Sequence, residues 1–154
     1  MSETGEQGQE LPQRAKAVID ALGLEPHPEG GWFRQTWLSP AGLVTDRGER
    51  AAASAILFLL PAGDASAWHM VVSDELWLWH GPGQLAIQLG GGDDQPSDEG
   101  PIIQLGGDVT AGQQAQVLVP AGSWQRTLPG SADVLVSCVV SPGFEYADWR
   151  LADE

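Results

Sequence analysis

Hydrophobic positions near the start of the chain recur with the period of a helix. The spacing is i, i+3, i+4 and i+7, at Ala15, Val18, Ile19 and Leu22. Residues at this spacing share one face of a helix that turns once every 3.6 residues. Gly23 follows at the place of a C-terminal capping glycine. The pattern therefore predicts one short amphipathic helix that starts at about Pro12 and ends before Gly23.

From Gly31 onward the pattern changes to short apolar runs separated by Gly, Pro and Asp. Such runs, bounded by turn residues, are typical of β-strands. We expect strands at Trp32–Leu38, Ala53–Leu60, Glu75–His80, Gln84–Leu89, Pro101–Leu105, Gln114–Val119, Ser123–Leu128, Asp133–Val140 and Phe144–Leu151. The polar segment 90–100 is expected to be a solvated loop. Many short strands with 20 glycines and 11 prolines between them predict an all-β sandwich or closed barrel.

Length and composition favour one domain without a structural crosslink. We expect residues 1–10 to be a flexible tail and residues 11–154 to form the single domain. The chain has one cysteine, Cys138, which lies in an apolar run and is expected to be a small buried residue. No apolar run has the length of a membrane-spanning helix, and the first residues lack the pattern of a secretory signal. A cytoplasmic location is therefore the expectation.

The charge balance excludes two classes of partner. Lysine and arginine total 7 against 21 acidic residues, which gives a formal net charge of −14. A nucleic-acid-binding protein needs a basic face to displace the counterions of phosphates, and anionic membranes also attract basic segments. We therefore expect neither nucleic acid nor a membrane as a partner, and a small molecule is the predicted ligand.

Two separated segments carry the candidate chemistry and resemble the signature motifs of the cupin superfamily. In that superfamily the first motif runs Gly, five residues, His-x-His, Glu and Gly, and the second is Pro-x-Gly-x-x-His. The residues that match are Gly63, His69, Glu75 and Gly81 in the first motif, and Pro120 and Gly122 in the second.

The resemblance is closer to one cupin subgroup of uncharacterised function, cupin-5. Four stretches in order carry it, at Leu24–Thr36, Ser66–Trp77, Pro120–Gln125 and Pro142–Glu145, and it extends over about residues 13 to 151. The resemblance implies a double-stranded β-helix, the cupin jelly-roll barrel, with one short N-terminal helix. It also implies a homodimer and a ligand pocket inside the barrel.

The departures from the superfamily motifs bear on a metal. In metal cupins the two histidines and the glutamate of the first motif and the histidine of the second converge on the ion. Here Val71 and Gln125 occupy two histidine positions, which leaves His69, Glu75 and Gln125 as the candidate ligands. This set is poor for Zn, Fe, Ni or Mn, so a metal-free site is favoured. Whether His27 or His80 completes the set stays open.

Without a metal, His69 and Glu75 are the candidate catalytic residues. The imidazole of His69 titrates near neutral pH and can act as a general acid or base, while Glu75 and Gln125 orient it or the substrate. Metal-free cupins such as the deoxysugar-nucleotide epimerases use a histidine base with a tyrosine acid, but the resemblance does not place Tyr146 in that role. The alternative is purely structural, with His69 and Glu75 bonded to each other.

The remaining candidates would bind substrate. Trp68 and Trp77 form either an aromatic wall or part of the core. Arg34 could hold an anion through its planar guanidinium, or form a salt bridge with a neighbouring acid. His27 lies between two prolines, and Glu29 precedes the pair Gly30-Gly31, so both are held at a sharp turn.

Three functions stay open from the sequence. The first is an isomerase- or epimerase-like enzyme that acts on a sugar or another polar metabolite. The second is a non-catalytic small-molecule binding module. The third is a metal-dependent hydrolase or oxygenase in which water completes the reduced ligand set. The sequence does not decide whether the protein is an enzyme, because one barrel supports many unrelated chemistries.

Overall fold

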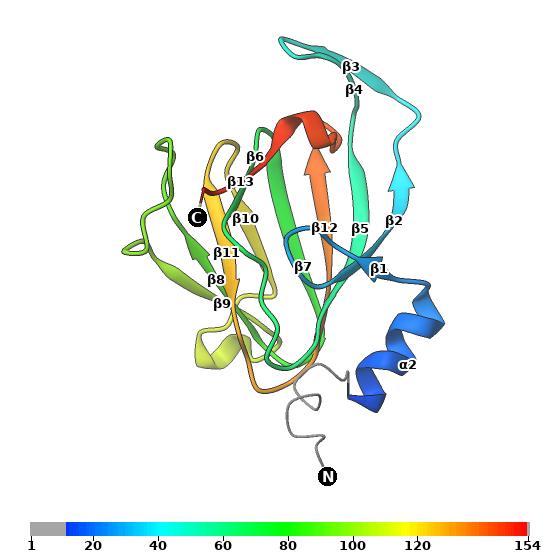
Figure 1. Ribbon diagram of the computed structural model, residues 1–154, viewed down its shortest axis with the longest axis vertical. Helices are drawn as coiled ribbons and strands as arrows, with labels where there is room; N and C mark the ends of the chain where they lie inside the picture. Colours follow the sequence, from blue (N-terminus) through cyan, green and yellow to red (C-terminus); the bar gives the residue numbers. More distant parts are fainter. Residues whose placement is uncertain (1–11, 154) are drawn as a thin grey trace.

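Two antiparallel sheets face each other in the computed structural model, which describes residues 12–153 (Figure 1). The expected tail at residues 1–10 lies outside the described residues. The six-stranded sheet has the order β1 (Glu25–Pro26), β2 (Trp32–Leu38), β5 (Ser54–Leu60), β12 (Val134–Ser141), β7 (Asp74–Pro82) and β10 (Gln116–Val119). The five-stranded sheet has the order β13 (Trp149–Leu151), β6 (His69–Val71), β11 (Trp124–Leu128), β8 (Leu85–Leu89) and β9 (Ile102–Leu105).

The single α-helix, α2 (Gln13–Leu22), confirms the helix prediction. Gly23 caps it in the left-handed conformation at φ 67°, and its backbone N–H donates to the carbonyl of Ile19. The apolar face of α2 packs on the outer face of the six-stranded sheet, where Ala15 and Ile19 meet Leu59 and the half-buried Leu57. The helix therefore covers one side of the sheet and leaves the space between the sheets to other side chains.

The core between the sheets is built by alternation along the strands. Residues at every second position of β12, from Val134 through Val136 and Cys138 to Val140, are buried. They pack with Phe58, Trp77, Ile87 and other buried residues of both sheets. The predicted all-β barrel architecture is confirmed, because the alternating strands bury one face against the opposite sheet.

The predicted strands are present with shifted ends, with one exception. The stretch Phe144–Leu151 is not one strand, because a 3₁₀ turn, η2 (Tyr146–Asp148), precedes the short strand β13. The two-stranded hairpin of β3 (Gly42–Thr45) and β4 (Gly48–Ala51), the short strand β6 and a second 3₁₀ turn, η1 (Val109–Ala111), were not expected. Segment 90–100 is a loop between β8 and β9, as expected.

The β3–β4 hairpin is joined to η2 by charge. Figure 1 shows the hairpin extending beyond the barrel at the end where η2 lies. Arg47 and Arg50 of the hairpin region both donate to the buried carboxylate of Asp148, at 2.7 Å and 2.8 Å respectively. This contact fixes the segment that closes one end of the barrel. Within the described part of the chain, no helix has both the length and the apolar character needed to cross a membrane.

Candidate functional site

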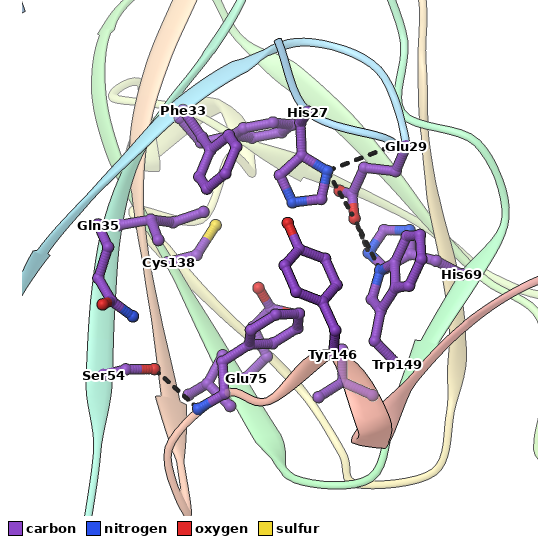
Figure 2. Close-up of a pocket in the computed structure, with 15 residues that line it drawn as sticks. His27, Glu29, Phe33, Gln35, Ser54, His69, Glu75, Cys138, Tyr146 and Trp149 are labelled. Atoms are coloured by element: carbon purple, nitrogen blue, oxygen red, sulfur yellow. Dashed lines mark hydrogen bonds and ion pairs between the residues drawn. The ribbon is translucent and has the colours of Figure 1, made fainter. Parts of the chain in front are cut away.

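A cavity of about 210 Å³ lies between the two sheets, at the end of the barrel covered by η2. Strands of both sheets contribute to it, together with the turn that precedes β2 and the segment around η2 (Figure 2). Its wall is formed by His27, Glu29, Phe33, Gln35, Ser54, Ile56, Phe58, His69, Val71, Glu75, Cys138, Val140, Phe144, Tyr146 and Trp149. Small-molecule sites are typically apolar hollows with a few convergent polar groups, and this cavity has that composition.

His69 presents its imidazole to the cavity from β6. The strand is held between β11 and β13, where His69 is paired with Gln125 and Leu151. The ring Nδ1–H donates to the carbonyl of Ala67 at 2.8 Å, which leaves Nε2 as the unprotonated nitrogen of the neutral ring. Burial lowers the pKa of His69, although the carboxylate of Glu75 acts in the opposite direction. The buried ring is therefore a neutral base with Nε2 free to accept a proton.

Glu29 faces that nitrogen from the turn between β1 and β2. Its Oε1 atom lies 3.4 Å from His69 Nε2 and accepts a hydrogen bond from the indole N–H of Trp149 at 3.2 Å. Burial raises the pKa of Glu29 to about 8, against the effect of the Trp149 hydrogen bond. At neutral pH the carboxyl group therefore keeps its proton and can act as an acid beside the basic Nε2 of His69.

The turn that carries Glu29 also carries His27. The backbone N–H of Glu29 donates to His27 Nδ1 at 3.1 Å, so the remaining proton of the neutral ring is on Nε2. Burial, with a further contribution from His69, lowers the pKa of His27 to about 4. The turn depends on glycine, since a Cβ on Gly31, at φ 81°, would lie 2.8 Å from the ring of Phe58.

Glu75 is held by a chain of hydrogen bonds from the core. The indole N–H of Trp77 donates to Gln125 Oε1 at 3.0 Å, and Gln125 Nε2 donates to Glu75 Oε1 at 2.8 Å. Burial raises the pKa of Glu75, and the charge of Glu29 raises it further, while His69 lowers it. Gln125 and Trp77 are therefore positioning residues for Glu75.

Cys138 lines the same part of the cavity as an unreactive thiol. It lies on β12, in the same wall as Glu75. Burial raises the pKa of Cys138 well above its ordinary value, and both glutamates add to this effect. Since the thiolate is the nucleophilic form, the thiol is inert at neutral pH.

The aromatic part of the wall comes from residues other than those expected. Phe33, Phe58, Phe144, Tyr146 and Trp149 line the cavity. Tyr146 packs edge to face against Trp149, with ring centroids 5.6 Å apart, and its hydroxyl points into the space between His27 and Glu75 in Figure 2. No described residue forms a hydrogen bond with that hydroxyl. The tyrosine that the motif comparison left without a role thus belongs to the cavity.

Three predicted substrate-binding residues lie outside the cavity, which corrects the expectation from the motifs. Arg34 is exposed on the helix side of β2, because its neighbours Phe33 and Gln35 take the inward positions. Trp68 lies on the outer side of the barrel, where Arg126 stacks on it at 4.5 Å. Trp77 is buried in the core and acts on the site only through Gln125.

The other predicted residues converge. His27, Glu29, His69 and Glu75 all line one cavity, and Gln125 touches it through Glu75. His80, in contrast, is exposed and bonds Ser137 at 2.7 Å. The purely structural alternative, in which His69 and Glu75 bond each other, does not describe the contacts, since His69 faces Glu29 and Glu75 bonds Gln125.

The residues at the expected metal position do not fit a transition metal. The carbonyl oxygen of Gln125 accepts from Trp77, and its amide nitrogen donates to Glu75, so both ends of the side chain already have partners within the protein. Val71 occupies a position where a ligand would be needed, and valine has no donor atom. Among residues 12–153, no group of three or more His, Cys, Asp or Glu side chains is arranged to hold a metal.

Part of the site could have been found from sequence alone. Alternation along Trp32–Leu38 places Phe33 and Gln35 on one face and Arg34 on the other, and the helix packing decides which face is inner. Tyr146 and Trp149 follow the Pro142–Glu145 motif, which was a signal for that region. Their inward direction depends on the η2 turn, and a strand prediction for Phe144–Leu151 conceals it.

The double-stranded β-helix and the polar cavity inside it define a protein of the cupin class. A family model described as Cupin superfamily (DUF985) matches residues 16–152, and the chain belongs to this family. The resemblance found in the motifs is thereby confirmed. No functionally curated protein matches the sequence.

Solved structures agree with the family assignment. A protein from Shewanella oneidensis is 35% identical, with a TM-score of 0.79 over 89% of this chain and 83% of its own. A hypothetical protein from Leishmania major is 31% identical, with a TM-score of 0.79 over 88% of this chain and 85% of its own. KdgF from Halomonas sp. is 14% identical over 77% of this chain and 86% of its own, with a TM-score of 0.53, and shows the shared fold alone.

Proposed function

We propose that the cavity is a small-molecule site for acid–base catalysis, and that the reaction is an isomerisation by proton transfer. The observation that carries the proposal is the pair formed by Glu29 and His69, whose Oε1 and Nε2 atoms lie 3.4 Å apart inside the cavity. A protonated carboxyl beside a neutral imidazole supplies one proton donor and one proton acceptor at neutral pH. Both roles are needed to move a hydrogen between two positions of one substrate.

In the proposed reaction, His69 Nε2 accepts a proton from a carbon next to a carbonyl group. That carbon carries a hydroxyl, so protonation of the carbonyl oxygen by Glu29 gives an enediol. His69 then returns its proton to the former carbonyl carbon, while the other hydroxyl gives its proton back to Glu29 and becomes the new carbonyl. The steps balance without an oxidant, a reductant or a leaving group. The Nε2–H group of His27 and the hydroxyl of Tyr146 are free to donate hydrogen bonds to substrate oxygens.

The positioning groups support the same assignment. The bond from His69 Nδ1 to Ala67 fixes the tautomer, as a partner on the second nitrogen does in other catalytic histidines. The chain from Trp77 through Gln125 holds Glu75, whose carboxylate stabilises the imidazolium that forms when His69 takes a proton. The pocket thus contains a base, an acid and an orienting carboxylate.

The test is exchange of substrate hydrogen with deuterated water, followed by proton NMR. The panel consists of small hydroxy-aldehydes and hydroxy-ketones, with and without an amine group. We expect exchange at the carbon next to the carbonyl, and we expect His69→Gln to lower the rate by about 100-fold or more, the usual contribution of a positioned base. His80→Gln, which changes an exposed imidazole outside the cavity, is the matched control and should leave the rate unchanged.

A second candidate function is a binding module that uses the same cavity without turnover. The aromatic wall favours it, because five aromatic rings supply contact area for a ligand whether or not chemistry follows. Compounds that bind the wild-type protein but show no deuterium exchange, and whose affinity is the same in His69→Gln, would support the module and contradict the isomerase.

A further inference from the structure

The wall of the cavity contains acids but no basic residue with a permanent charge. Glu29 and Glu75 line it, while lysine and arginine are absent from the residues that form the wall. The arginines that form salt bridges among residues 12–153 lie elsewhere: Arg47 and Arg50 bind Asp148, and Arg150 lies beside Asp94. An anionic ligand would therefore meet two carboxyl groups and no cation, which is an unfavourable field for it.

The two acids have neutral hydrogen-bond partners. Glu29 Oε1 accepts from the indole of Trp149, and Glu75 Oε1 accepts from the amide of Gln125. Glu29 Oε2 has no hydrogen-bond partner among residues 12–153, although the side chain is only 8% exposed. The neighbouring rings of His27 and His69 are held neutral by burial, so neither compensates an ionised carboxylate. A buried oxygen of this kind is left for a donor from a ligand.

The part of the wall next to Glu29 is aromatic. Phe144 and Tyr146 meet edge to face at 4.9 Å, and Tyr146 and Trp149 do so at 5.6 Å. An edge-to-face contact covers one face of one ring at most, so these contacts leave the other ring faces uncovered. The faces of Trp and Tyr rings carry partial negative charge and attract ammonium groups, especially where water is excluded. Carboxyls and aromatic faces in one cavity thus favour the same kind of ligand.

We propose that the cavity binds a small organic ammonium ion, with its nitrogen beside Glu29 and its carbon atoms against the Tyr146 and Trp149 rings. The Nε2–H group of His27 donates to an oxygen of the same ligand, which makes an amino alcohol or amino carbonyl compound the fitting class. The inference rests on the cavity being the ligand site, as proposed above, but it does not rest on turnover. It narrows the expected polar metabolite to a cationic one.

The decisive probes differ in charge but not in shape. Choline and 3,3-dimethylbutan-1-ol are isosteric, since a quaternary nitrogen in the first is a carbon atom in the second. Ethanolamine presents the same chain with a primary ammonium group. We expect titration calorimetry at pH 7 to show choline or ethanolamine binding about tenfold more tightly than the neutral alcohol, a ratio that corresponds to about 1.4 kcal/mol. Whichever of choline and ethanolamine binds more tightly shows whether the site prefers a quaternary or a primary ammonium group.

Two glutamine variants locate the charge. A cation bound beside Glu29 favours the ionised form of its carboxyl group, which then gives up its proton. Glu29→Gln keeps the shape of the side chain and cannot ionise, so the preference for the cation should fall to about threefold or less. Glu25→Gln is the matched control, because it makes the same substitution at a glutamate that is exposed on β1. It should keep the wild-type preference. Circular dichroism melts of both variants establish that each is folded before binding is compared.

The outcomes separate this inference from the proposed function. Cation preference without deuterium exchange on any substrate supports the ammonium site and contradicts the isomerase. Exchange with only neutral or anionic substrates, and equal binding of choline, ethanolamine and the neutral alcohol, overturns the ammonium site and leaves the isomerase standing. A preference retained in Glu29→Gln also overturns the inference, and so does the absence of binding by either cation at about 50 mM, a concentration far above any useful ligand affinity.

Discussion

Two buried carboxyl groups lie at the same end of the barrel, in opposite electrostatic environments. Asp148 in η2 is compensated by Arg47 and Arg50, and the Arg50 hydrogen bond is the main reason that its pKa falls to about 2. Glu29 in the cavity has no such partner, and burial raises its pKa to about 8. The difference separates a carboxylate that holds structure from a carboxyl that is kept available for chemistry.

The contrast also has a geometric side. Asp148 lies between Tyr146 and Trp149 in sequence, and these two residues form the cavity wall next to Glu29. The compensated acid therefore fixes the segment that encloses the uncompensated one. The salt bridges between the β3–β4 hairpin and η2 stabilise this end of the barrel, which offsets the cost of burying the Glu29 carboxyl in the cavity.

The largest expected effect comes from breaking the compensated group. Asp148→Asn removes the charge that three side-chain hydrogen bonds from two arginines satisfy, and it leaves both guanidinium groups without their counterion. We expect the free energy of unfolding to fall by about 3 kcal/mol, the usual cost of removing one partner of a buried ion pair. Urea unfolding at pH 7 measures it, with Asp46→Asn in the exposed turn of the same hairpin as the control.

The stability contribution of Asp148 depends on pH in a direction that its pKa defines. The pKa of Asp148 is lowered in the folded state, from 3.8 to about 2, so its contribution is present above pH 4 and is lost as the pH falls toward 2. Asp148→Asn should therefore approach the wild type in stability over this range. A constant difference between the two proteins from pH 5 to pH 2 would contradict the assignment.

Replacing Glu29, the carboxyl without a cationic partner, should raise the free energy of unfolding rather than lower it. The pKa of Glu29 is 4.5 in the unfolded chain and about 8 in the folded protein, so only the unfolded chain loses the proton as the pH rises between these values. The stabilising contribution of Glu29 is complete below pH 4.5 and declines up to pH 8. Glu29→Gln should gain on the wild type by about 1 kcal/mol for each pH unit between pH 5 and pH 8.

Thermal or urea unfolding in a pH series measures this gain. Glu25→Gln, outside the cavity, should follow the wild-type curve throughout. If Glu29→Gln instead remains at a fixed offset from the wild type at every pH, then Glu29 titrates normally and the comparison with Asp148 fails.

A smaller effect is expected from the hydrogen-bond chain behind Glu75. Trp77→Phe removes the indole N–H that Gln125 Oε1 accepts, and the buried amide oxygen is left without a partner. We expect a loss of about 1.5 kcal/mol in unfolding free energy, the range for one orphaned buried acceptor. Trp37→Phe is the control, because Trp37 is 48% exposed on the outside of β2. Equal losses in the two variants would show that the chain does not hold Glu75.

The smallest effect should come from Arg34, which sequence motifs placed at the site. It is exposed on the helix side of β2, while the cavity lies on the other side of that strand. Arg34→Ala should change unfolding free energy by less than about 0.5 kcal/mol, as is usual for surface positions, and should leave choline affinity unchanged. A loss of choline affinity in calorimetry would contradict the placement of Arg34 outside the ligand site.

Individual elements show how far the sequence could be used as a guide. The period of Ala15, Ile19 and Leu22 with the capping Gly23 predicted α2 correctly, because helix formation depends on neighbours within one turn. The alternation in Asp133–Val140 predicted β12 for the same local reason. Phe144–Leu151 was wrongly predicted as one strand, because the salt bridges that shape η2 come from residues about 100 positions earlier.

The chain by itself determined the class of fold and most of the polar site. Its local periodicities define helix and strands, and its motifs identified His27, Glu29, His69 and Glu75, all of which reach the cavity. Only the tertiary structure decided that Glu29 faces His69 and that the Gln125 amide oxygen accepts a hydrogen bond from Trp77. It also decided that Tyr146 and Trp149 complete the cavity wall. Those facts depend on which strands lie side by side and on what is buried with each acid. Burial and pairing set the pKa of a carboxyl, and both are properties of three-dimensional packing rather than of neighbours along the chain.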